Sequence, residues 1–389
     1  MFDKCKGNCI TCGKCASAAI LDEYCAKGQV FTPRQGYGIA VDLGTTTIVL
    51  ALIDLSCGSV VARHSFMNPQ RAFGPDVISR IDAANKGYLA KLCHMITDSI
   101  SGGITILLAA KNISPKKIVD IVVAGNTVMT YLLLELPCEN LGITPFKAIY
   151  KLEKSYDSKR LFGLSELQCS VRVTPWMTAY VGGDVTAGLI YVIAQGKRRF
   201  LLMDLGTNGE MLLYGDGRLT VTATAAGPAF EQPVMASKNF QGASGVINTL
   251  AELVRQELVD EAGALENEVI FTQKQVRDLQ LAKSAIRSGL EILLEINGYD
   301  YGDLETVYLA GGIGQGMNVQ DAADIGLIPK ALKNKTLPVG NASLGGAATL
   351  LTCPPQTAGT IDELLPAVTE INLAAYPRFH EYFMEYMSF

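Results

Sequence analysis

The sequence predicts an α/β protein of two lobes, each lobe a mixed β-sheet with flanking helices. Two stretches carry this prediction. Residues 201–231 start with an apolar strand that ends in Asp-Leu-Gly-Thr, and a second short strand follows the turn. Residues 37–51 repeat the plan of apolar strand, Asp-Leu-Gly-Thr and apolar strand. Asp42 and Asp204 lie 162 positions apart, so each hairpin can open its own half of a 389-residue chain that exceeds the usual size of one core.

The turn of the second hairpin has the composition of a phosphate-binding loop. Gly206 and Gly209 remove side chains where a backbone would approach a ligand, and Thr207 and Asn208 add a hydroxyl and an amide beside the exposed N–H groups. Asp204 stands where a carboxylate could hold a magnesium ion through its waters. For one copy alone, a polar β-hairpin with an Asx-Gly turn is the simpler interpretation. Two facing copies could hold one polyphosphate and its metal between them.

Composition narrows the class of protein. A hydrophobic content of 49% with 18% charged residues is typical of a globular protein with a sizeable core. The net charge of −5 does not indicate binding to nucleic acid, which requires a surface rich in positive charge. No uninterrupted apolar run approaches the roughly 20 residues of a membrane span, and the first ten residues contain no apolar signal core. We therefore expect a cytoplasmic protein that binds neither nucleic acid nor a membrane.

Half of the ten cysteines stand in the first 25 residues. Cys5, Cys9, Cys12 and Cys15 have the spacing C-x3-C-x2-C-x2-C, close to the runs by which ferredoxin-like loops hold an iron–sulfur cluster. Four ligands suit a [4Fe–4S] cluster, and Cys25 is then a spare or alternate ligand. A structural zinc site is the second interpretation, although zinc more often uses two separated C-x2-C pairs. A cysteine-rich tail without metal is the third.

The expected domains are residues 1–35 (cysteine-rich segment and linker), 36–195 (first lobe), 196–352 (second lobe) and 353–389 (C-terminal tail). In the first lobe, a strand over residues 117–124 ends in a polar turn at Asn126, which either binds ligand or only caps the next helix. In the second lobe, Thr272 caps a long helix that carries Lys283 and Arg287. That basic face is either solvated or lines a nucleoside, and solvation is the expectation.

Two further glycine-rich segments are candidates for the site. Residues 182–188 contain Asp184, which either caps a helix or orients water at a γ-phosphate; we expect the second because the segment leads into the second hairpin. An apolar strand ends at Gly311, Gly312 and Gly314, where a backbone could lie against a purine or ribose. The glycine spacing matches no dinucleotide fingerprint, and the chain has no P-loop motif.

These motifs resemble the nucleotide-binding core shared by actin, sugar kinases, acetate kinase and the large heat-shock chaperones, which implies a two-lobed actin-like ATPase fold. More narrowly, the chain resembles the ATP-dependent reductive activators of corrinoid proteins. The resemblance covers about residues 36–350 and depends on the ordered motifs VDLGTTT, NPQxxFGxDVISRI, AGNTVM, YVGGDVTAG, LLMDLGTNGEM, ATAAGPAFE and LAGGIGQGMN. Members of that family typically carry an N-terminal plant-type [2Fe–2S] ferredoxin domain, whereas this sequence has the short cysteine run.

The resemblance implies a function and its site. ATP would lie between the lobes, with Mg²⁺ near Asp42 and Asp204 and with Asp184 orienting the attacking water. The implied phosphate contacts are Gly44, Thr45, Thr46, Gly206, Thr207 and Asn208, and the late glycines would hold adenosine. The implied activity reduces the Co(II) corrinoid of a methyltransferase corrinoid protein to Co(I), with electrons from a low-potential donor. A homodimer working in anaerobic metabolism is expected on the same ground.

Three alternatives belong to other functional classes. An activator of radical dehydratases also joins ATP to a [4Fe–4S] cluster, but its cysteines come from the body of the ATPase, and Cys138, Cys169 and Cys353 lack paired spacing. A small-molecule kinase gives no reason for the leading cysteines. A nucleotide-switched binding module would hold zinc in the cysteine segment instead of iron.

Overall fold

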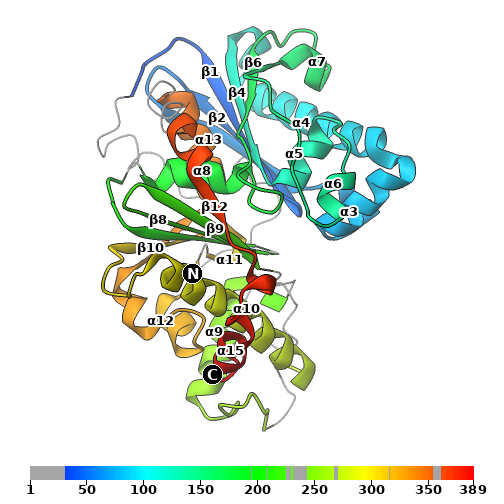
Figure 1. Ribbon diagram of the computed structural model, residues 1–389. Coiled ribbons are helices and arrows are strands. Elements are labelled where there is room, and N and C mark those ends of the chain that lie inside the picture. Colours follow the sequence, from blue (N-terminus) through cyan, green and yellow to red (C-terminus); the bar gives the residue numbers. More distant parts are fainter. Residues whose placement is uncertain are drawn as a thin grey trace. The chain divides into compact units, whose positions relative to one another are not determined.

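The computed structural model describes residues 31–193, 195–206, 208–224, 229–230, 243–266, 270–314, 316–353 and 361–389. The chain forms two compact units: unit 1 takes the described residues of Met1–Gln195 and Ala342–Leu365, and unit 2 those of Gly196–Asn341 and Pro366–Phe389. Each unit contains a six-stranded mixed sheet with helices packed on it (Figure 1). The predicted α/β class with two mixed sheets is therefore confirmed.

The unit 1 sheet has the order β3-β2-β1-β4-β6-β5. Its central strand β1 is antiparallel to β2, with Leu43 opposite Ile48, and parallel to β4. This register places the turn after β1 at the same edge of the sheet as the end of β4. The strands are β1 (Tyr37–Leu43), β2 (Thr47–Asp54), β3 (Ser59–Met67), β4 (Ile118–Gly125), β5 (Tyr156–Asp157) and β6 (Ser170–Val173).

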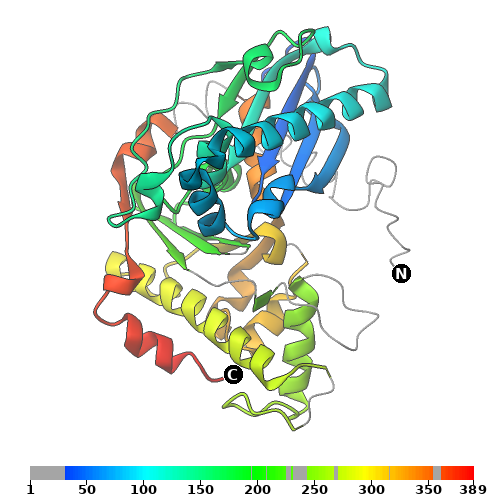
Figure 2. The same cartoon turned by 90° about the vertical axis from the view of Figure 1, so that its right-hand side faces the viewer.

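One face of this sheet is covered by a long helical segment, prominent in Figure 2. It runs through α3 (Val77–Ala83), the π-helical turn η2 (Ala84–Tyr88) and α4 (Leu89–Lys111), with a kink at Gly87, whose φ is 92°. By length and composition alone, Val77–Lys111 could cross a membrane. Its apolar side chains, among them Ile96 and Ile100, pack instead in one core with Ile39 and Leu50 of the sheet, as in a buried core helix.

Several shorter elements complete this side of unit 1. They are α5 (Thr127–Leu133), α6 (Glu139–Gly142), α7 (Ser158–Phe162) and the 3-10 turns η1 (Pro69–Phe73) and η3 (Pro115–Lys117). The buried residues of α5 join the same core as the long helix.

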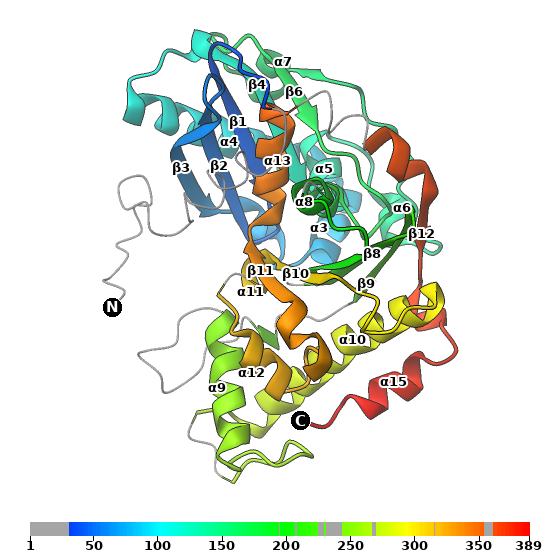
Figure 3. The same cartoon turned by 90° about the vertical axis from the view of Figure 1, so that its left-hand side faces the viewer.

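The other face of the unit 1 sheet is covered by two helices of small residues, α8 (Gly183–Ile193) and α13 (Ala342–Thr352). They pack on Ala40 and Ala124 of the sheet and lie side by side (Figure 3). A Cβ atom on Gly346 would lie 1.9 Å from the carbonyl oxygen of Ala187, so the two helices meet at a distance that only glycine permits.

The unit 2 sheet has the order β11-β10-β7-β8-β9-β12. Its strand β7 is antiparallel to β8 and parallel to β10, which is the pattern of β1 with β2 and β4 in unit 1. The duplication predicted from the two hairpins therefore extends to the sheet topology. The strands are β7 (Phe200–Leu205), β8 (Gly209–Gly215), β9 (Arg218–Thr224), β10 (Thr306–Ala310), β11 (Thr336–Gly340) and β12 (Val368–Glu370).

The helices of unit 2 pack on one face of its sheet. The longest, α10 (Gln273–Asn297), begins at Thr272 with a capping box to Gln275, as predicted, and contributes Ile286 and Leu290 to the core. The others are α9 (Ala243–Arg255), α11 (Gly311–Gly314), α12 (Val319–Asp324) and α15 (Phe379–Glu385), with the 3-10 turns η5 (Lys330–Lys335), η6 (Leu365–Ala367) and η7 (Leu373–Ala375).

The C-terminal segment lies along α10 (Figure 3). Lys283 is 1% exposed; its Nζ donates to the carbonyl oxygen of Ser388 and lies 5.1 Å from the centre of the Phe389 ring. Arg287 is 9% exposed and lies 4.5 Å from the centre of the Tyr386 ring. The expectation that this basic face is solvated was wrong, because the end of the chain covers it.

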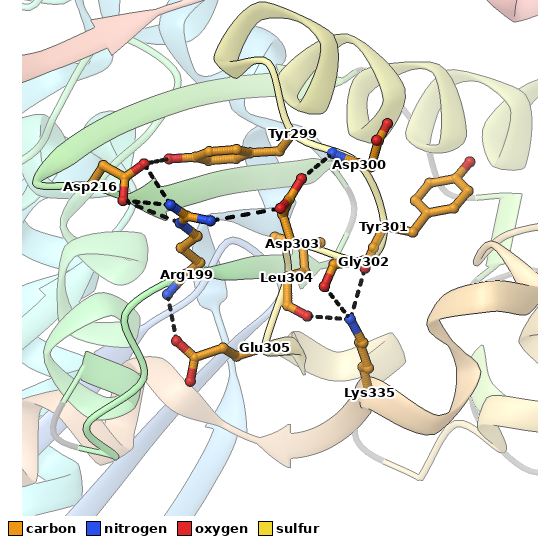
Figure 4. A network of polar contacts seen from close by, with 10 residues as sticks. All are labelled: Arg199, Asp216, Tyr299, Asp300, Tyr301, Gly302, Asp303, Leu304, Glu305 and Lys335. Atoms are coloured by element: carbon orange, nitrogen blue, oxygen red, sulfur yellow. Dashed lines mark hydrogen bonds and ion pairs between the residues drawn. The ribbon is translucent and has the colours of Figure 1, made fainter.

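A polar network fixes the loop between α10 and β10 (Figure 4). Arg199, just before β7, forms a two-pronged ion pair with Asp216, and its backbone N–H donates to Glu305, just before β10. Lys335 Nζ donates to the carbonyl oxygens of Tyr301, Gly302 and Leu304 at 2.9, 2.8 and 2.6 Å. These contacts hold the starts of β7 and β10, whose far ends carry Asp204 and Gly311.

The units differ from the domain boundaries expected from the sequence at two places. α13 lies in unit 1, although residues 196–352 were expected to form one lobe. Residues 366–389 lie in unit 2 and are not a separate tail. In both cases the reason is packing: α13 buries its small residues against α8, and the last helix covers α10. The cysteine-rich segment 1–30 is outside the described residues.

Candidate functional site

The same arrangement of an aspartate and a glycine occurs once in each unit. In unit 1, Asp42 is the last but one residue of β1 and pairs in register with Ala124 of β4. A Cβ atom on the next residue, Gly125, would lie 2.9 Å from the carbonyl oxygen of Leu43. The glycine therefore lets the end of β4 press against the turn that follows Asp42.

Unit 2 repeats this geometry with different residues. Asp204 is the last but one residue of β7 and pairs with Ala310 of β10. A Cβ atom on Gly311, whose φ is +83°, would lie 2.3 Å from Asp204 Oδ1 and 2.6 Å from the carbonyl oxygen of Leu205. Gly311 is thus required by the fold, because any side chain would displace the aspartate.

Three side chains hold the turn after β1 by hydrogen bonds to its carbonyl and hydroxyl oxygens. Asn68 Nδ2 donates to the carbonyl oxygen of Gly44 at 2.9 Å, and Arg80 Nη2 donates to that of Thr45 at 2.6 Å. Asn126 Nδ2 donates to Thr45 Oγ1 at 2.9 Å. A Cβ atom on Gly44 would lie 2.6 Å from the Thr47 carbonyl oxygen, so this glycine is required by the turn. The carbonyl groups of the turn are held inside the fold, which is how a loop presents its N–H groups to an anion.

Asn126 caps the following helix, one of the two roles that the sequence left open for that turn, and it also holds the turn between β1 and β2. Its Oδ1 accepts from the N–H of Met129 and caps α5, while its Nδ2 holds Thr45. Gly182 packs against the backbone of Asn126. A Cβ atom on Gly182 would lie 2.4 Å from the Asn126 Cα. The end of β4 therefore brings the phosphate-type turn and the Gly-Gly-Asp segment together.

Asp184 begins α8 on the sheet face to which Asp42 belongs. Its Oδ1 accepts from the N–H of Val185 at 2.9 Å. Burial and, to a lesser extent, the charge of the neighbouring Asp42 carboxylate raise the pKa of the Asp184 carboxyl to about 7. Asp42 Oδ1 in turn accepts a hydrogen bond of 2.8 Å from Ser343 in the first turn of α13. Three side chains from β1, α8 and α13 thus converge in unit 1.

The predicted glycines of unit 2 divide into those the fold requires and those it does not. Gly311 is required, and a Cβ atom on Gly314 would lie 3.0 Å from the Leu309 backbone. By contrast, among the described residues a Cβ atom on Gly312 would meet nothing within 4 Å, and one on Gly206 only the Asn208 carbonyl oxygen at 4.0 Å. Glycine at a position with open space is consistent with the approach of a ligand. Thr207, also predicted to contact phosphate, lies outside the described residues.

The donor set suits a magnesium ion that keeps most of its waters. Among the described residues, no group of three or more His, Cys, Asp or Glu side chains could enclose a metal. The carboxylates of Asp42 and Asp184 nevertheless repel each other, and a divalent cation offsets such repulsion. Mg²⁺ is usually held by one or two carboxylates together with phosphate oxygens and water, so the Asp42 carboxylate beside a phosphate-type turn fits it.

The cysteines that the structure describes are poorly suited to bind a cluster. Cys93, Cys138 and Cys353 are buried, and burial raises the pKa of each thiol, to about 11 for Cys93 and about 12 for Cys138. Cys169 is half-buried with a pKa raised to about 11, and Cys57 is exposed on the turn between β2 and β3. The predicted ligands Cys5, Cys9, Cys12 and Cys15 all lie outside the described residues.

Sequence reasoning missed Ser343, Asn68 and Arg80. The contact of Ser343 with Asp42 spans 301 positions, so no local pattern in the sequence indicates it. Asn68 and Arg80 stand in the motif NPQxxFGxDVISRI, which carried the family resemblance without indicating that both side chains hold the β1–β2 turn.

The duplicated sheets, with an aspartate and a glycine at each central strand end, define the class of protein: an actin-like ATPase domain, the ASKHA fold. A family model described as the RACo middle region matches residues 37–195, and one for the C-terminal domain of RACo, the ASKHA domain, matches residues 198–238 and 260–389.

Individual relatives agree with these models. The chain is 32% identical over 418 residues to the corrinoid activation enzyme RamQ of Eubacterium limosum, covering 90% of this chain and 69% of that protein. It is 23% identical over 383 residues to a reductase of the Co(II) methylated amine-specific corrinoid protein of Methanosarcina barkeri, covering 81% and 70%. The solved structure of a reductive activator for corrinoid, iron–sulfur protein matches with a TM-score of 0.81 at 28% identity, covering 92% of this chain and 66% of that chain. The chain belongs to the family of corrinoid activation enzymes.

Proposed function

We propose that this protein is an ATP-dependent reductive activator, which returns the Co(II) corrinoid of a methyltransferase corrinoid protein to Co(I). One electron passes from a low-potential donor to cobalt, and ATP hydrolysis supplies the free energy for that unfavourable transfer. The observation that carries the proposal is the 32% identity over 90% of the chain to a corrinoid activation enzyme. The arrangement of an aspartate and a glycine that occurs in both units supports the proposal, because these residues are among those that the sequence predicts to bind ATP.

The roles of the individual residues are part of this proposal. The turns at Gly44, Thr45 and Thr46 and at Gly206, Thr207 and Asn208 bind phosphate oxygens. The N–H groups of Gly44 and Gly206 donate within their own turns, so these two glycines serve by letting the backbone approach the phosphate, and the other residues supply the donors. Asp42 and Asp204 orient the waters of Mg²⁺, and Asp184 orients the attacking water and takes its proton. A carboxylate whose pKa lies near neutrality is suited to accept a proton at physiological pH. Gly312 leaves room for the adenosine.

The electron path is proposed to pass through the N-terminal cysteines. Cys5, Cys9, Cys12 and Cys15 would hold a [4Fe–4S] cluster, which when bound supplies a one-electron carrier of low potential. The raised pKa values of the buried thiols support this choice, because a thiol must lose its proton to ligate iron. A homodimer in the cytoplasm of an anaerobic cell is part of the same proposal, and light scattering on the anaerobic protein tests the dimer.

The test is ATP hydrolysis by the anaerobically reconstituted protein, with and without a Co(II) corrinoid protein, while the absorbance of Co(I) is followed. The expected result is Co(I) formation that requires both ATP and a low-potential reductant. Asp204→Asn is expected to abolish it, whereas Asp82→Asn, which changes a carboxylate paired with Lys86 on the surface, is expected to leave it intact.

Metal analysis of the same sample separates the alternatives. Iron and sulfide in the wild type that are lost in Cys12→Ser but kept in Cys57→Ser support the cluster. Zinc with ATP hydrolysis but no Co(I) would overturn the redox function and leave a nucleotide-switched binding module. Iron with activation of a dehydratase, but not of a corrinoid protein, would assign the chain to the other group of ATP-dependent activators.

A further inference from the structure

A buried arginine donates a hydrogen bond to the turn between β1 and β2. Arg80, on α3, has 0% exposed surface. Its Nη2 donates to the Thr45 carbonyl oxygen at 2.6 Å, the one short bond to oxygen that it makes with the described residues. The remaining contacts are longer bonds to the Gly74 carbonyl oxygen and Gln70 Oε1, both 3.4 Å, and a contact of Nη1 with Met129 Sδ at 3.2 Å.

All of these acceptors are uncharged. Among the described residues, no carboxylate forms an ion pair with Arg80. The carboxylate whose charge acts on Arg80 is Asp76, the residue before α3, whose Oδ1 caps that helix by accepting from the N–H and the hydroxyl of Ser79. The attraction of Asp76 is opposed by the charge of Arg71. Burial lowers the pKa of Arg80 to about 10, so its guanidinium still carries its charge at neutral pH.

A buried cation without an anion is unfavourable by several kcal/mol, which is why buried charges in proteins are nearly always paired. The short hydrogen bond of Arg80 indicates where a counter-anion would bind, because its acceptor is in the turn to which the proposed function assigns phosphate. We propose that the counter-charge of Arg80 is the polyphosphate of the bound nucleotide, and that Arg80 is a positioning residue that acts through the Thr45 turn. This inference rests on the proposed binding of ATP at that turn.

Two consequences distinguish this role from simple support of the turn. First, without nucleotide the buried charge is a cost, so Arg80→Met is expected to leave the melting temperature nearly unchanged, because relief of that charge offsets the hydrogen bonds that are lost. Secondly, the charge favours polyanions specifically, so the same change weakens binding of ATP and of inorganic tripolyphosphate by about tenfold or more, with little effect on adenosine. A residue that only supported the turn would lower the melting temperature and weaken all nucleotides alike.

Asn68 provides the matched control. It holds the same turn through the Gly44 carbonyl oxygen at 2.9 Å but carries no charge. Asn68→Ala is therefore expected to lower the melting temperature, and the affinities for ATP and ADP are expected to fall by a similar factor. Arg80→Lys keeps the positive charge and loses the planar guanidinium with its several N–H donors. This variant is therefore expected to retain most of the preference for ATP over adenosine.

The experiment measures the melting temperature of the full chain with and without ATP, ADP, tripolyphosphate and adenosine, followed by calorimetric titration. If Arg80→Met proves insoluble, the comparison of Arg80→Lys with Arg80→Gln tests the same dependence on charge. A wild-type protein that binds ATP as tightly as its Arg80→Met and Arg80→Gln variants would overturn this inference alone. A wild type with no response to ATP would overturn the proposed function together with it.

Discussion

Ser343 Oγ donates a hydrogen bond of 2.8 Å to Asp42 Oδ1, although the two residues stand 301 positions apart. Ser343 lies in the first turn of α13, the helix with which the chain returns to unit 1. Asp42 lies at the end of β1, and the pKa of the Asp184 carboxyl is raised in part by its charge. The hydrogen bond therefore fixes one of the carboxylates to which we assign the magnesium waters.

We expect Ser343→Ala to lower ATP hydrolysis by about threefold to tenfold, because one hydrogen bond to a charged group is worth about 1.5–3 kcal/mol and part of it is replaced by water. Alanine suits a helix interior, so the fold is retained. Steady-state ATPase rates check this expectation. The control is Thr349→Ala on the same helix, whose hydroxyl donates only to the Gly345 carbonyl oxygen. Equal rates in the two variants would contradict a role for Ser343 at Asp42.

Asp184→Asn separates binding of ATP from its hydrolysis. An amide cannot accept the proton of the attacking water, and loss of a general base costs typically about 10²- to 10⁴-fold in rate. Removal of one of two repelling carboxylates leaves ATP affinity unchanged or improved. Single-turnover hydrolysis and an equilibrium titration of ATP measure the two quantities separately. A proportional loss in both would show that Asp184 acts in binding.

Two glycine-to-alanine changes are expected to have opposite effects. Gly312→Ala adds a methyl group that would meet no described residue within 4 Å, so the melting temperature stays constant while ATP affinity falls. Gly346→Ala places a methyl group 1.9 Å from the Ala187 carbonyl oxygen, so it forces α13 away from α8. Overpacking of this kind costs about 1–3 kcal/mol or more of the free energy of unfolding. Thermal melts with and without ATP distinguish the two, and an unchanged ATP response in Gly312→Ala would remove this glycine from the site.

Lys283 makes stability depend on pH. Burial, together with the charge of Arg287, lowers its pKa from 10.5 in the unfolded chain to about 7 in the folded protein. Between these values the unfolded chain binds more protons, so this lysine makes the free energy of unfolding rise with pH from about 7 upward. Below pH 7 the full cost of the buried charge is present. Lys283→Met is expected to be the more stable protein at pH 6 and to lose this advantage toward pH 10.

Urea unfolding of the wild type and of Lys283→Met at a series of pH values checks this expectation. The difference between the two curves isolates Lys283 from the tyrosines and cysteines that titrate in the same range. Lys274→Met on the same helix is the control, because Lys274 is exposed. A difference between wild type and Lys283→Met that does not vary with pH would show that the lysine is charged throughout.

Alkylation of thiols tests the assignment of the cysteines. In native protein without cluster, Cys57 is expected to react with iodoacetamide readily, and Cys138 slowly, because its thiol is 1% exposed with a pKa raised to about 12. Reconstitution with iron and sulfide is expected to protect Cys5, Cys9, Cys12 and Cys15 and to leave Cys57 reactive. Mass spectrometry of the peptides reads the result. Protection of Cys57 or Cys169 instead would contradict this assignment and would indicate that cysteines in the ATPase units bind the cluster.

The local parts of the site could be predicted from the sequence. The two Asp-Leu-Gly-Thr hairpins, the Gly-Gly-Asp helix start and the glycine turn at Gly311 all stand where the sequence placed them at strand or helix ends. Each depends on neighbouring residues, because an apolar run ending in glycine is a short-range signal. The roles of Asp42, Asp184 and Asp204 in catalysis stay predictions.

The sequence by itself determined that the fold is duplicated, that each half opens with a hairpin ending in aspartate and glycine, and that the family is that of corrinoid activation enzymes. Only the tertiary structure decided that Ser343 bonds Asp42, that Arg80 stands behind the Thr45 turn, and that the C-terminal residues bury Lys283. The physical reason is the range of the contacts. Spacing along a helix specifies which side chains share a face, but what covers that face is set by segments distant in the chain.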